Sequence, residues 1–142
     1  MQEAGAKVQN LLTKGSLNHL TYQLKQTAEV HFEHIKDSIA LAQKNGIATN
    51  VYLEDWSNGM RNSPDYVYSF LDFLNTQPIK RVLLPDTLGV LTPTETFKYL
   101  SEIISSLGKL AFPTISWPKV SMNVFTLSKL VISFPLCFII FK

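Results

Sequence analysis

The chain has 142 residues, which is long enough for one domain with its own hydrophobic core. Its 13 Lys and Arg residues nearly balance its 11 Asp and Glu residues without a basic stripe, so we expect no nucleic-acid partner. The lone Cys137 excludes an intramolecular disulfide and a cysteine-based metal site, and it favours a reducing, cytoplasmic location.

The first predicted elements are a strand and a helix. Residues 6–12 predict a strand that carries the apolar residues Val8, Leu11 and Leu12, and a polar connection follows over residues 13–16. A helix is predicted over residues 28–44, because apolar side chains recur there at spacings of three and four. Asn45 and Gly46 are typical of a helix C-terminus.

Two further strand and helix pairs follow. Residues 51–53 predict a strand, and Ser63-Pro64 predicts an N-cap and the first residue of the next helix. Residues 80–84 predict a third strand, and Thr92-Pro93 begins a helix that ends at Gly108. The apolar face of this last helix is expected to bury Phe97, Leu100, Ile103, Ile104 and Leu107. Residues 111–116 open a possible fourth strand, so the chain is predicted to have an α/β fold.

Acidic residues follow two of these strands. Glu54 and Asp55 end the second strand, where neighbouring side chains point to opposite faces, so only one of them can face an active site as a general acid or base. Equally, both could cap the next helix or pair with a neighbouring Lys or Arg, and Arg61 is near in the sequence. Asp86 and Thr87 form either a tight turn or a site in which the Thr87 hydroxyl holds a substrate carboxylate.

The three histidines offer weaker signals. His31 and His34 lie three residues apart on the first predicted helix, a spacing that could present two metal ligands on one side. Charged neighbours favour the alternative of a solvated helix face. His19 lies in a predicted loop without a recognisable partner.

Three segments together resemble a known family. They are Gly5–Ser16, Tyr52–Gly59 (YLEDWSNG) and Leu84–Pro93 (LPDTLGVLTP). They are similar to the third, fourth and fifth strands of the barrel enzymes that include 2-isopropylmalate synthase, homocitrate synthase and hydroxymethylglutaryl-CoA lyase. The resemblance implies a partial (β/α)8 TIM barrel, from about strand 3 to strand 6, over residues 1–118.

The resemblance also implies an activity. Intact members use a divalent metal ion (Mg, Mn or Zn) to join acetyl-CoA to a 2-oxo acid, as in leucine biosynthesis. By position, Glu54 belongs to the catalytic pocket, Thr87 contacts the substrate carboxylate, and Asp55 and Asp86 are further candidates for substrate binding.

Two features depart from the family. The Asp ligand and catalytic Arg of its first strand have no counterpart before Ala6, and residues 112–118 lack the His-x-His pair of its sixth strand. We therefore expect no metal ligand in this chain, and a fragment that is inactive alone. The alternative is a small non-catalytic protein that associates through exposed strand edges or is tethered to a membrane.

The C-terminal tail differs in composition from the rest of the chain. Residues 119–142 are expected to be an irregular, non-homologous apolar segment. Because Lys129 and Pro135 interrupt it, its longest uninterrupted apolar run falls short of the roughly 20 residues of a spanning helix. A membrane anchor is therefore the less favoured interpretation.

Overall fold

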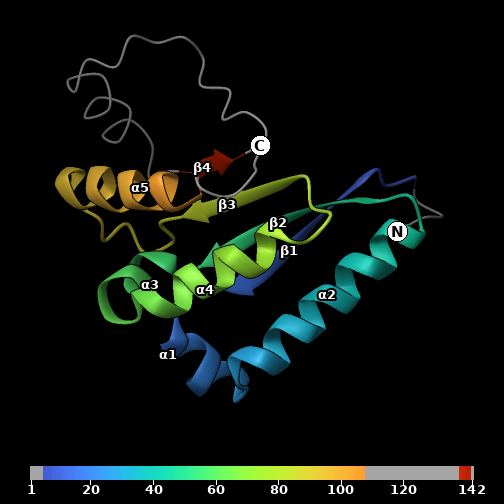
Figure 1. Cartoon of the computed structure of the whole chain (residues 1–142), viewed down its shortest axis with the longest axis horizontal. Helices are drawn as coiled ribbons and strands as arrows, with labels where there is room; N and C mark the ends of the chain where they lie inside the picture. The colour runs from blue at the N-terminus through green and yellow to red at the C-terminus, as the bar shows by residue number, and fades with distance from the viewer. Residues whose placement is uncertain (1–4, 108–137, 142) are drawn as a thin grey trace, which may run out of the picture.

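A computed structural model describes residues 5–107 and 138–141 of the chain (Figure 1). Its sheet has the order β1-β2-β3-β4. The strands β1 (Val8–Lys14), β2 (Ala48–Glu54) and β3 (Arg81–Pro85) are parallel, as the α/β prediction requires. The fourth strand, β4 (Phe138–Phe141), pairs antiparallel with β3 and was not predicted. The possible strand at residues 111–116 and the proposed boundary after residue 118 lie outside the described residues.

The helices between the strands form one layer. The three long ones, α2 (Ala28–Lys44), α4 (Pro64–Asn75) and α5 (Pro93–Leu107), follow β1, β2 and β3 respectively. Contacts join α2 to α4 and α4 to α5, so the helices lie side by side in the order of their strands (Figure 1). Repeated parallel β/α units of this kind are the building blocks of a (β/α)8 barrel, which confirms the predicted fold class.

Shorter helical segments follow the first two strands. After β1 come α1 (Leu17–His19) and the π-helical turn η1 (Leu20–Leu24), and after β2 comes α3 (Trp56–Asn62). The sequence predicted irregular connections at both places. The predicted end of the first strand was also wrong, because pairing with β2 continues through Lys14 and Glu54. Thr13 is a polar residue within β1, and its hydroxyl donates to the carbonyl oxygen of Tyr52 at 2.7 Å.

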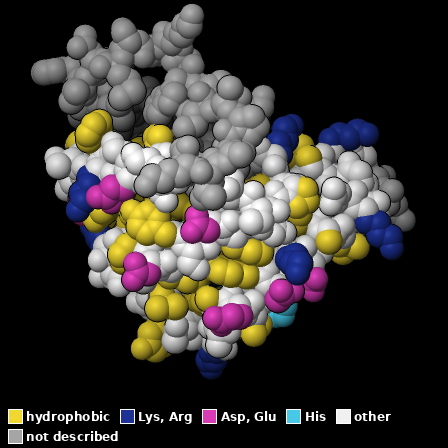
Figure 2. Space-filling model, in the orientation of Figure 1, with side chains coloured by type: hydrophobic (Ala, Val, Ile, Leu, Met, Phe, Trp, Pro, Cys, Tyr) yellow, Lys and Arg dark blue, Asp and Glu magenta, His cyan; other side chains and the backbone are white. Residues whose placement is uncertain are grey.

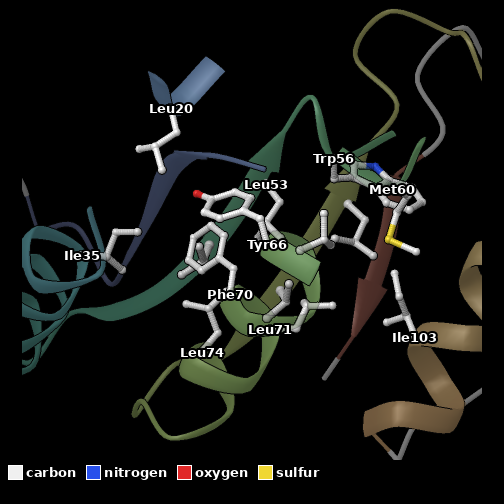
Figure 3. Close-up of a cluster of buried hydrophobic side chains, with 14 of the residues drawn as sticks. Leu20, Ile35, Leu53, Trp56, Met60, Tyr66, Phe70, Leu71, Leu74 and Ile103 are labelled. Atoms are coloured by element: carbon white, nitrogen blue, oxygen red, sulfur yellow. The ribbon is translucent and has the colours of Figure 1, made fainter. Parts of the chain in front are cut away.

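The hydrophobic core lies between the sheet and the helices. Alternation along β2 directs Val51 and Leu53 toward the helices, where both are fully buried. Figure 3 shows Phe70 and Leu74 of α4 near the middle of this core and Ile103 of α5 near Met60 of α3. The opposite face of β1 is exposed, since 62% of Leu12 remains accessible to solvent.

Aromatic rings join α2 to α4. Phe32 stacks on Phe73 with a centroid distance of 4.8 Å and on Phe70 at 5.1 Å, and the His31 ring meets Phe70 edge-on at 5.7 Å. His31 is only 6% exposed, so the predicted solvated face is wrong for this residue, whereas His34 is exposed. The neighbouring Phe70 explains why an imidazole at this position is buried.

A close backbone contact holds α3 against the end of β1. A Cβ atom at Gly59 would lie 2.2 Å from the carbonyl oxygen of Gly15 and 2.8 Å from Cγ2 of Val67. A Cβ atom at Gly15 would lie 3.0 Å from the carbonyl oxygen of Glu54. The two glycines therefore allow helix and strand to approach more closely than any larger residue would permit.

The surface carries both signs of charge. On the face drawn in Figure 2, Lys and Arg side chains are interspersed with Asp and Glu side chains. Among the described residues, no helix combines the length and apolarity that crossing a membrane requires.

A capping box begins α5 and is tied to α3. The Thr92 hydroxyl accepts from the Glu95 N–H at 3.2 Å, and a Glu95 carboxylate oxygen accepts from the Thr92 N–H at 2.9 Å. The same carboxylate pairs with Arg61 through two hydrogen bonds of 2.8 Å. The prediction that Phe97 is buried on this helix was wrong, since it is 49% exposed, whereas Leu100 and Ile103 are buried as predicted.

We expect the Glu95→Gln variant to lose thermal stability at neutral pH and to match the parent near pH 2. The hydrogen bonds from Arg61 and Thr92 lower the pKa of Glu95 to about 2 from 4.5. A lowered pKa gives stability that is present above pH 4.5 and lost as the pH falls toward 2. Melting temperatures across this range measure the effect. A difference between the two proteins that does not shrink with acidity would contradict it.

Candidate functional site

The carboxyl ends of β1, β2 and β3 meet at one edge of the sheet. There, Lys14 and Glu54 are register partners on adjacent strands, and their side chains form an ion pair of 2.5 Å. By alternation, both point away from the face that carries Val51 and Leu53. Both are only partly exposed, with 18% of the Lys14 side chain and 27% of the Glu54 side chain accessible. Glu54 is therefore a half-buried acid on the side of the sheet opposite the helices.

The backbone of Lys14 is held by two helices. Its N–H donates to Nε2 of His31 in α2 at 3.4 Å, and its carbonyl oxygen accepts from the Tyr66 hydroxyl of α4 at 2.8 Å. Burial is the main cause that lowers the pKa of His31 to about 4, so this imidazole is neutral near pH 7 and can accept that bond. Burial also raises the pKa of Tyr66. These contacts fix the position of Lys14 beside Glu54.

Asp55 points to the helix side and is almost fully enclosed. Its carboxylate accepts from the Ser16 hydroxyl at 2.6 Å and from the Asn58 side-chain amide at 2.7 Å, and Nε2 of His19 lies 3.4 Å from Oδ2. Only 3% of Asp55 is exposed. It has a positive φ of 64°, which is uncommon for a residue with a side chain. These contacts join the segment after β1 to the start of α3.

Asp86 closes the loop after β3. One carboxylate oxygen accepts from the Ser57 hydroxyl at 2.7 Å, and the other accepts from the Leu91 N–H at 2.9 Å. The turn is completed by Gly89, whose N–H donates to the carbonyl oxygen of Asp86 and whose φ is +63°. The turn interpretation therefore describes Asp86, which is buried and held by its own loop.

Thr87 lies in the same turn but is exposed. Its backbone N–H donates to the carbonyl oxygen of Pro85 at 3.0 Å, which fixes the residue at the end of β3. An exposed hydroxyl in this position is available to an external oxygen, so the geometry is compatible with the predicted substrate contact.

The four predicted site residues thus separate into two kinds. Glu54 and Thr87 are accessible from outside, whereas Asp55 and Asp86 hold loops together. The alternative in which the strand-end acids pair with a Lys or Arg is confirmed for Glu54, which pairs with Lys14, whereas the nearby Arg61 pairs with Glu95 instead. Asp55 occupies the N-cap position of α3, but its side chain makes no capping hydrogen bond.

Sequence reasoning missed three side chains of this edge. Lys14 was assigned to a connection, so its pairing with Glu54 could not be seen. Ser16 and His19 belong to a segment without apolar periodicity, and their contact with Asp55 depends on folding across 39 and 36 positions of the chain respectively. No local pattern in residues 16–19 signals that both side chains contact the same acid.

The described residues do not fit the divalent metal that the resemblance implies. Within residues 5–107, no three His, Cys, Asp or Glu side chains come together as metal ligands would. Glu54 is paired with an ammonium group, and the carboxylates of Asp55 and Asp86 accept hydrogen bonds from the hydroxyls of Ser16 and Ser57 respectively. These side chains are therefore unsuited to hold a divalent metal ion among themselves.

Part of this chain is similar in sequence to known proteins. The model of the HMGL-like family matches residues 1–114. The chain is 32% identical over 91 residues to a probable 2-isopropylmalate synthase of Ignicoccus hospitalis. This alignment covers 64% of this chain and 22% of that protein. It is 27% identical over 90 residues to the 2-isopropylmalate synthase of Sulfolobus acidocaldarius, covering 63% of this chain and 22% of that protein. The match thus spans about a fifth of each relative's length, and since the family model covers most of this sequence, the chain belongs to the HMGL-like family.

Proposed function

We propose that this chain carries the acid–base and carboxylate-binding part of an acyltransferase site that condenses acetyl-CoA with a 2-oxo acid. The observation that supports it is the position of Glu54 at the carboxyl edge of the sheet, half-buried and on the side opposite the helices. In barrel enzymes the active site lies at this edge. The 2-isopropylmalate synthases among the relatives supply the reaction class.

Each residue then has a defined task. The Glu54 carboxylate accepts a proton from the carbon next to the thioester carbonyl, and the Lys14 ammonium beside it holds the carboxylate in position. The Thr87 hydroxyl donates to a carboxylate oxygen of the 2-oxo acid. Asp55 and Asp86 touch no substrate in this scheme and keep the loops after β2 and β3 in place.

We further propose that the chain alone does not turn over, because its described residues form no metal site and a metal ion supplies the Lewis acid in the family. Thiol release from acetyl-CoA, followed with a 2-oxo acid and Mg²⁺, Mn²⁺ or Zn²⁺, measures this directly. Steady turnover by the purified chain would contradict it. The cytoplasmic location inferred from Cys137 stays a prediction.

Glu54→Ala is expected to lower turnover about a hundredfold, the lower end of what a general acid or base contributes. The measurement uses a chimera in which the matching segment of the Sulfolobus acidocaldarius 2-isopropylmalate synthase is replaced by that of this chain. Glu54→Gln should be similarly impaired, because it keeps the shape and removes the base. Thr87→Ala is expected to raise KM for the 2-oxo acid.

The control for this experiment is Glu33→Ala, an exposed acid on α2 far from the strand ends in sequence. It should leave kcat and KM unchanged. Equal activity of the chimera and its Glu54→Ala variant would refute the role of Glu54. A folded chimera that is inactive before any substitution would count against the transferred site as a whole.

One observation favours a non-catalytic alternative. β1 is an edge strand of the sheet, and its Val8 and Leu12 side chains are 38% and 62% exposed. An open edge with apolar side chains is suited to pairing with another chain. Concentration-dependent association that Leu12→Lys abolishes would support this alternative.

A further inference from the structure

The outer edge of β1 carries backbone groups that no described strand uses. Among the described residues, β1 pairs with β2 alone. The carbonyl oxygen of Lys7, just before β1, accepts from the Ala48 N–H, so the odd-numbered residues direct their backbone groups toward β2. Because successive backbone groups of a strand point in opposite directions, those of Val8, Asn10 and Leu12 point outward. These three residues can therefore pair with a further strand.

The open part of this edge ends at Lys14. The Lys14 N–H donates to His31 and its carbonyl oxygen accepts from Tyr66, so its backbone groups are not available to another strand. Lys14 is the only charged residue of β1, and its side chain is paired with Glu54. Outward charges and Pro residues are the usual protection of an edge strand. From Val8 to Leu12, β1 has neither.

An exposed stripe on α2 lies on the same side of the chain. It consists of Val30, His34, Asp37 and Leu41, at spacings that place them along one face of a helix. Phe32, which packs on α4, lies on the opposite face. Since α2 is the outermost of the three long helices, the α2 stripe has no helix beside it among the described residues (Figure 1). Val30 and Leu41 are apolar, yet they are 43% and 63% exposed.

The α2 stripe is complementary to itself. When two copies of α2 lie antiparallel, Val30 faces Leu41 of the second copy and His34 faces Asp37 of the second copy. Asp37 has no hydrogen-bond partner among the described residues. Nδ1 of His34 lies 3.5 Å from the side-chain amide of Gln26, whereas no described group pairs with its Nε2. An imidazole N–H can therefore donate to the opposite carboxylate in a charge-assisted hydrogen bond.

Pairing of β1 with a second β1 has one favoured register. In an antiparallel pair, residues whose backbone groups point outward must face each other. When Asn10 faces Asn10 of the second copy, Val8 faces Leu12, and the two exposed apolar side chains form two symmetric pairs. A shift by two residues in one direction would place Val8 opposite Lys14, whose backbone groups are already bonded. A shift in the other direction would place Leu12 opposite Ala6, outside the strand.

The helix and the strand agree on the position of the symmetry axis. The midpoint of the α2 stripe lies between residues 35 and 36. Two contacts align α2 with β1, because the Gln9 side-chain amide donates to the Ser38 carbonyl oxygen at 3.5 Å and the Lys14 N–H donates to His31. Interpolation between these contacts places Asn10 within about one helical turn of that midpoint. One two-fold axis beside Asn10 therefore serves both pairings.

We propose that this chain forms a two-fold symmetric dimer through β1 and the α2 stripe. The two β1 strands pair antiparallel, so the two sheets become one, and the two α2 helices lie side by side over the joint. A second copy is the partner because both the register of β1 and the order of the α2 stripe are matched by their own reverse. The proposal deepens the non-catalytic alternative given above by naming its partner, and it does not depend on the acyltransferase proposal.

Sedimentation equilibrium of the full chain at pH 7 over a range of concentrations tests the proposal. We expect a reversible dimer with twice the chain mass of 16.0 kDa. Leu12→Lys should raise the dimer Kd by at least about tenfold, because it places an ammonium group opposite Val8 of the second copy. The matched control is Leu88→Lys, which makes the same change at a residue that is 65% exposed in the loop after β3. It should dimerise as the parent does.

A charge exchange tests the pairing of the α2 stripe. His34→Glu places a carboxylate opposite Asp37, and Asp37→Lys removes the acceptor of His34. Each should raise the dimer Kd at least about fivefold, since the pair occurs twice in the dimer. The double variant restores an opposite-charge pair and should return the Kd to within about twofold of the parent. Asp72→Lys, which changes an exposed acid of α4, is the control and should leave the Kd unchanged.

Disulfide formation tests the register of β1. In a Cys137→Ser background, Asn10→Cys should form an intermolecular disulfide on mild oxidation, because the paired Cα atoms lie about 5.5 Å apart. Leu12→Cys should not crosslink, because its two copies lie more than about 13 Å apart in this register.

Four outcomes would overturn the dimer. They are a folded parent that stays monomeric at every concentration, equal effects of Leu12→Lys and Leu88→Lys, a double variant of His34 and Asp37 no better than the single ones, and crosslinking of Leu12→Cys in place of Asn10→Cys. Circular dichroism of each variant confirms that it is folded. Since the readout is mass and not turnover, failure of the dimer leaves the role of Glu54 to its own test.

Discussion

Gly59→Ala is expected to lower the free energy of unfolding by about 3 kcal/mol, because the new methyl group overlaps with rigid backbone. Its Cβ would lie 2.2 Å from the Gly15 carbonyl oxygen and 2.8 Å from Val67. The overlap cannot be relieved by rotating a side chain away from the oxygen. Relief requires α3 to move from the end of β1, which disturbs the packing of Trp56 and Met60 in the core. Urea denaturation followed by circular dichroism measures the change.

Asn62→Ala is the control for this substitution. It introduces the same side chain on the same helix at an exposed position. Because Ala favours helix formation, it should change stability by less than about 0.5 kcal/mol. Equal denaturation midpoints for the two variants would show that the close contact between Gly15 and Gly59 is not needed for stability.

The second large effect is a loss of stability between pH 6.5 and pH 4, caused by His31. The pKa of this residue is lowered to about 4 in the folded chain from 6.5, mainly by burial and further by His34 and Lys14. In this interval the unfolded chain binds a proton that the folded chain does not, so stability falls as the pH falls. The full effect is about 3 kcal/mol, of which roughly half is lost between pH 6.5 and pH 5.

Unfolding free energies at pH 6.5 and pH 5 measure this dependence. Both values lie above pH 4.5, so the pH dependence of stability that Glu95 causes is small in this interval. His31→Phe should flatten the slope, although the variant starts less stable because the Lys14 N–H loses its acceptor. His34→Gln, an exposed neighbour on α2, should keep most of the slope. A slope that survives in His31→Phe would mean that another group binds the proton.

Much of the fold could be predicted because its signals are local. The bounds of α2 agree with the predicted residues 28–44, since apolar spacing and the Asn45-Gly46 signal act within one segment. The start of α5 was predicted from Thr92-Pro93, and its capping box is likewise local. The segments α1, η1 and α3 were missed because they are too short to show apolar periodicity, and α3 is held by a contact distant in sequence, between Gly15 and Gly59.

The sequence predicted that the candidate site lies at the strand ends, but not which side chains meet there. Glu54 and Asp55 were rightly expected to face opposite sides, because alternation is a property of any strand. Glu54 rather than Asp55 lies beside Lys14 because of the register in which β1 pairs with β2. That register cannot be predicted from the local sequence of either strand. The burial of His31 depends in the same way on Phe70, 39 residues further along the chain.

The pairing of β1 with β2 also decides on which face of the sheet the Glu54 and Asp55 side chains lie. The Gly15 N–H donates to the Glu54 carbonyl oxygen at 2.7 Å, which continues the ladder one residue beyond β1. A slip of β2 by a single residue would exchange the two carboxylates, sending Glu54 among the helices and Asp55 to the opposite face. An insertion within residues 48–54 would therefore alter the chemistry of this edge while leaving every side chain present.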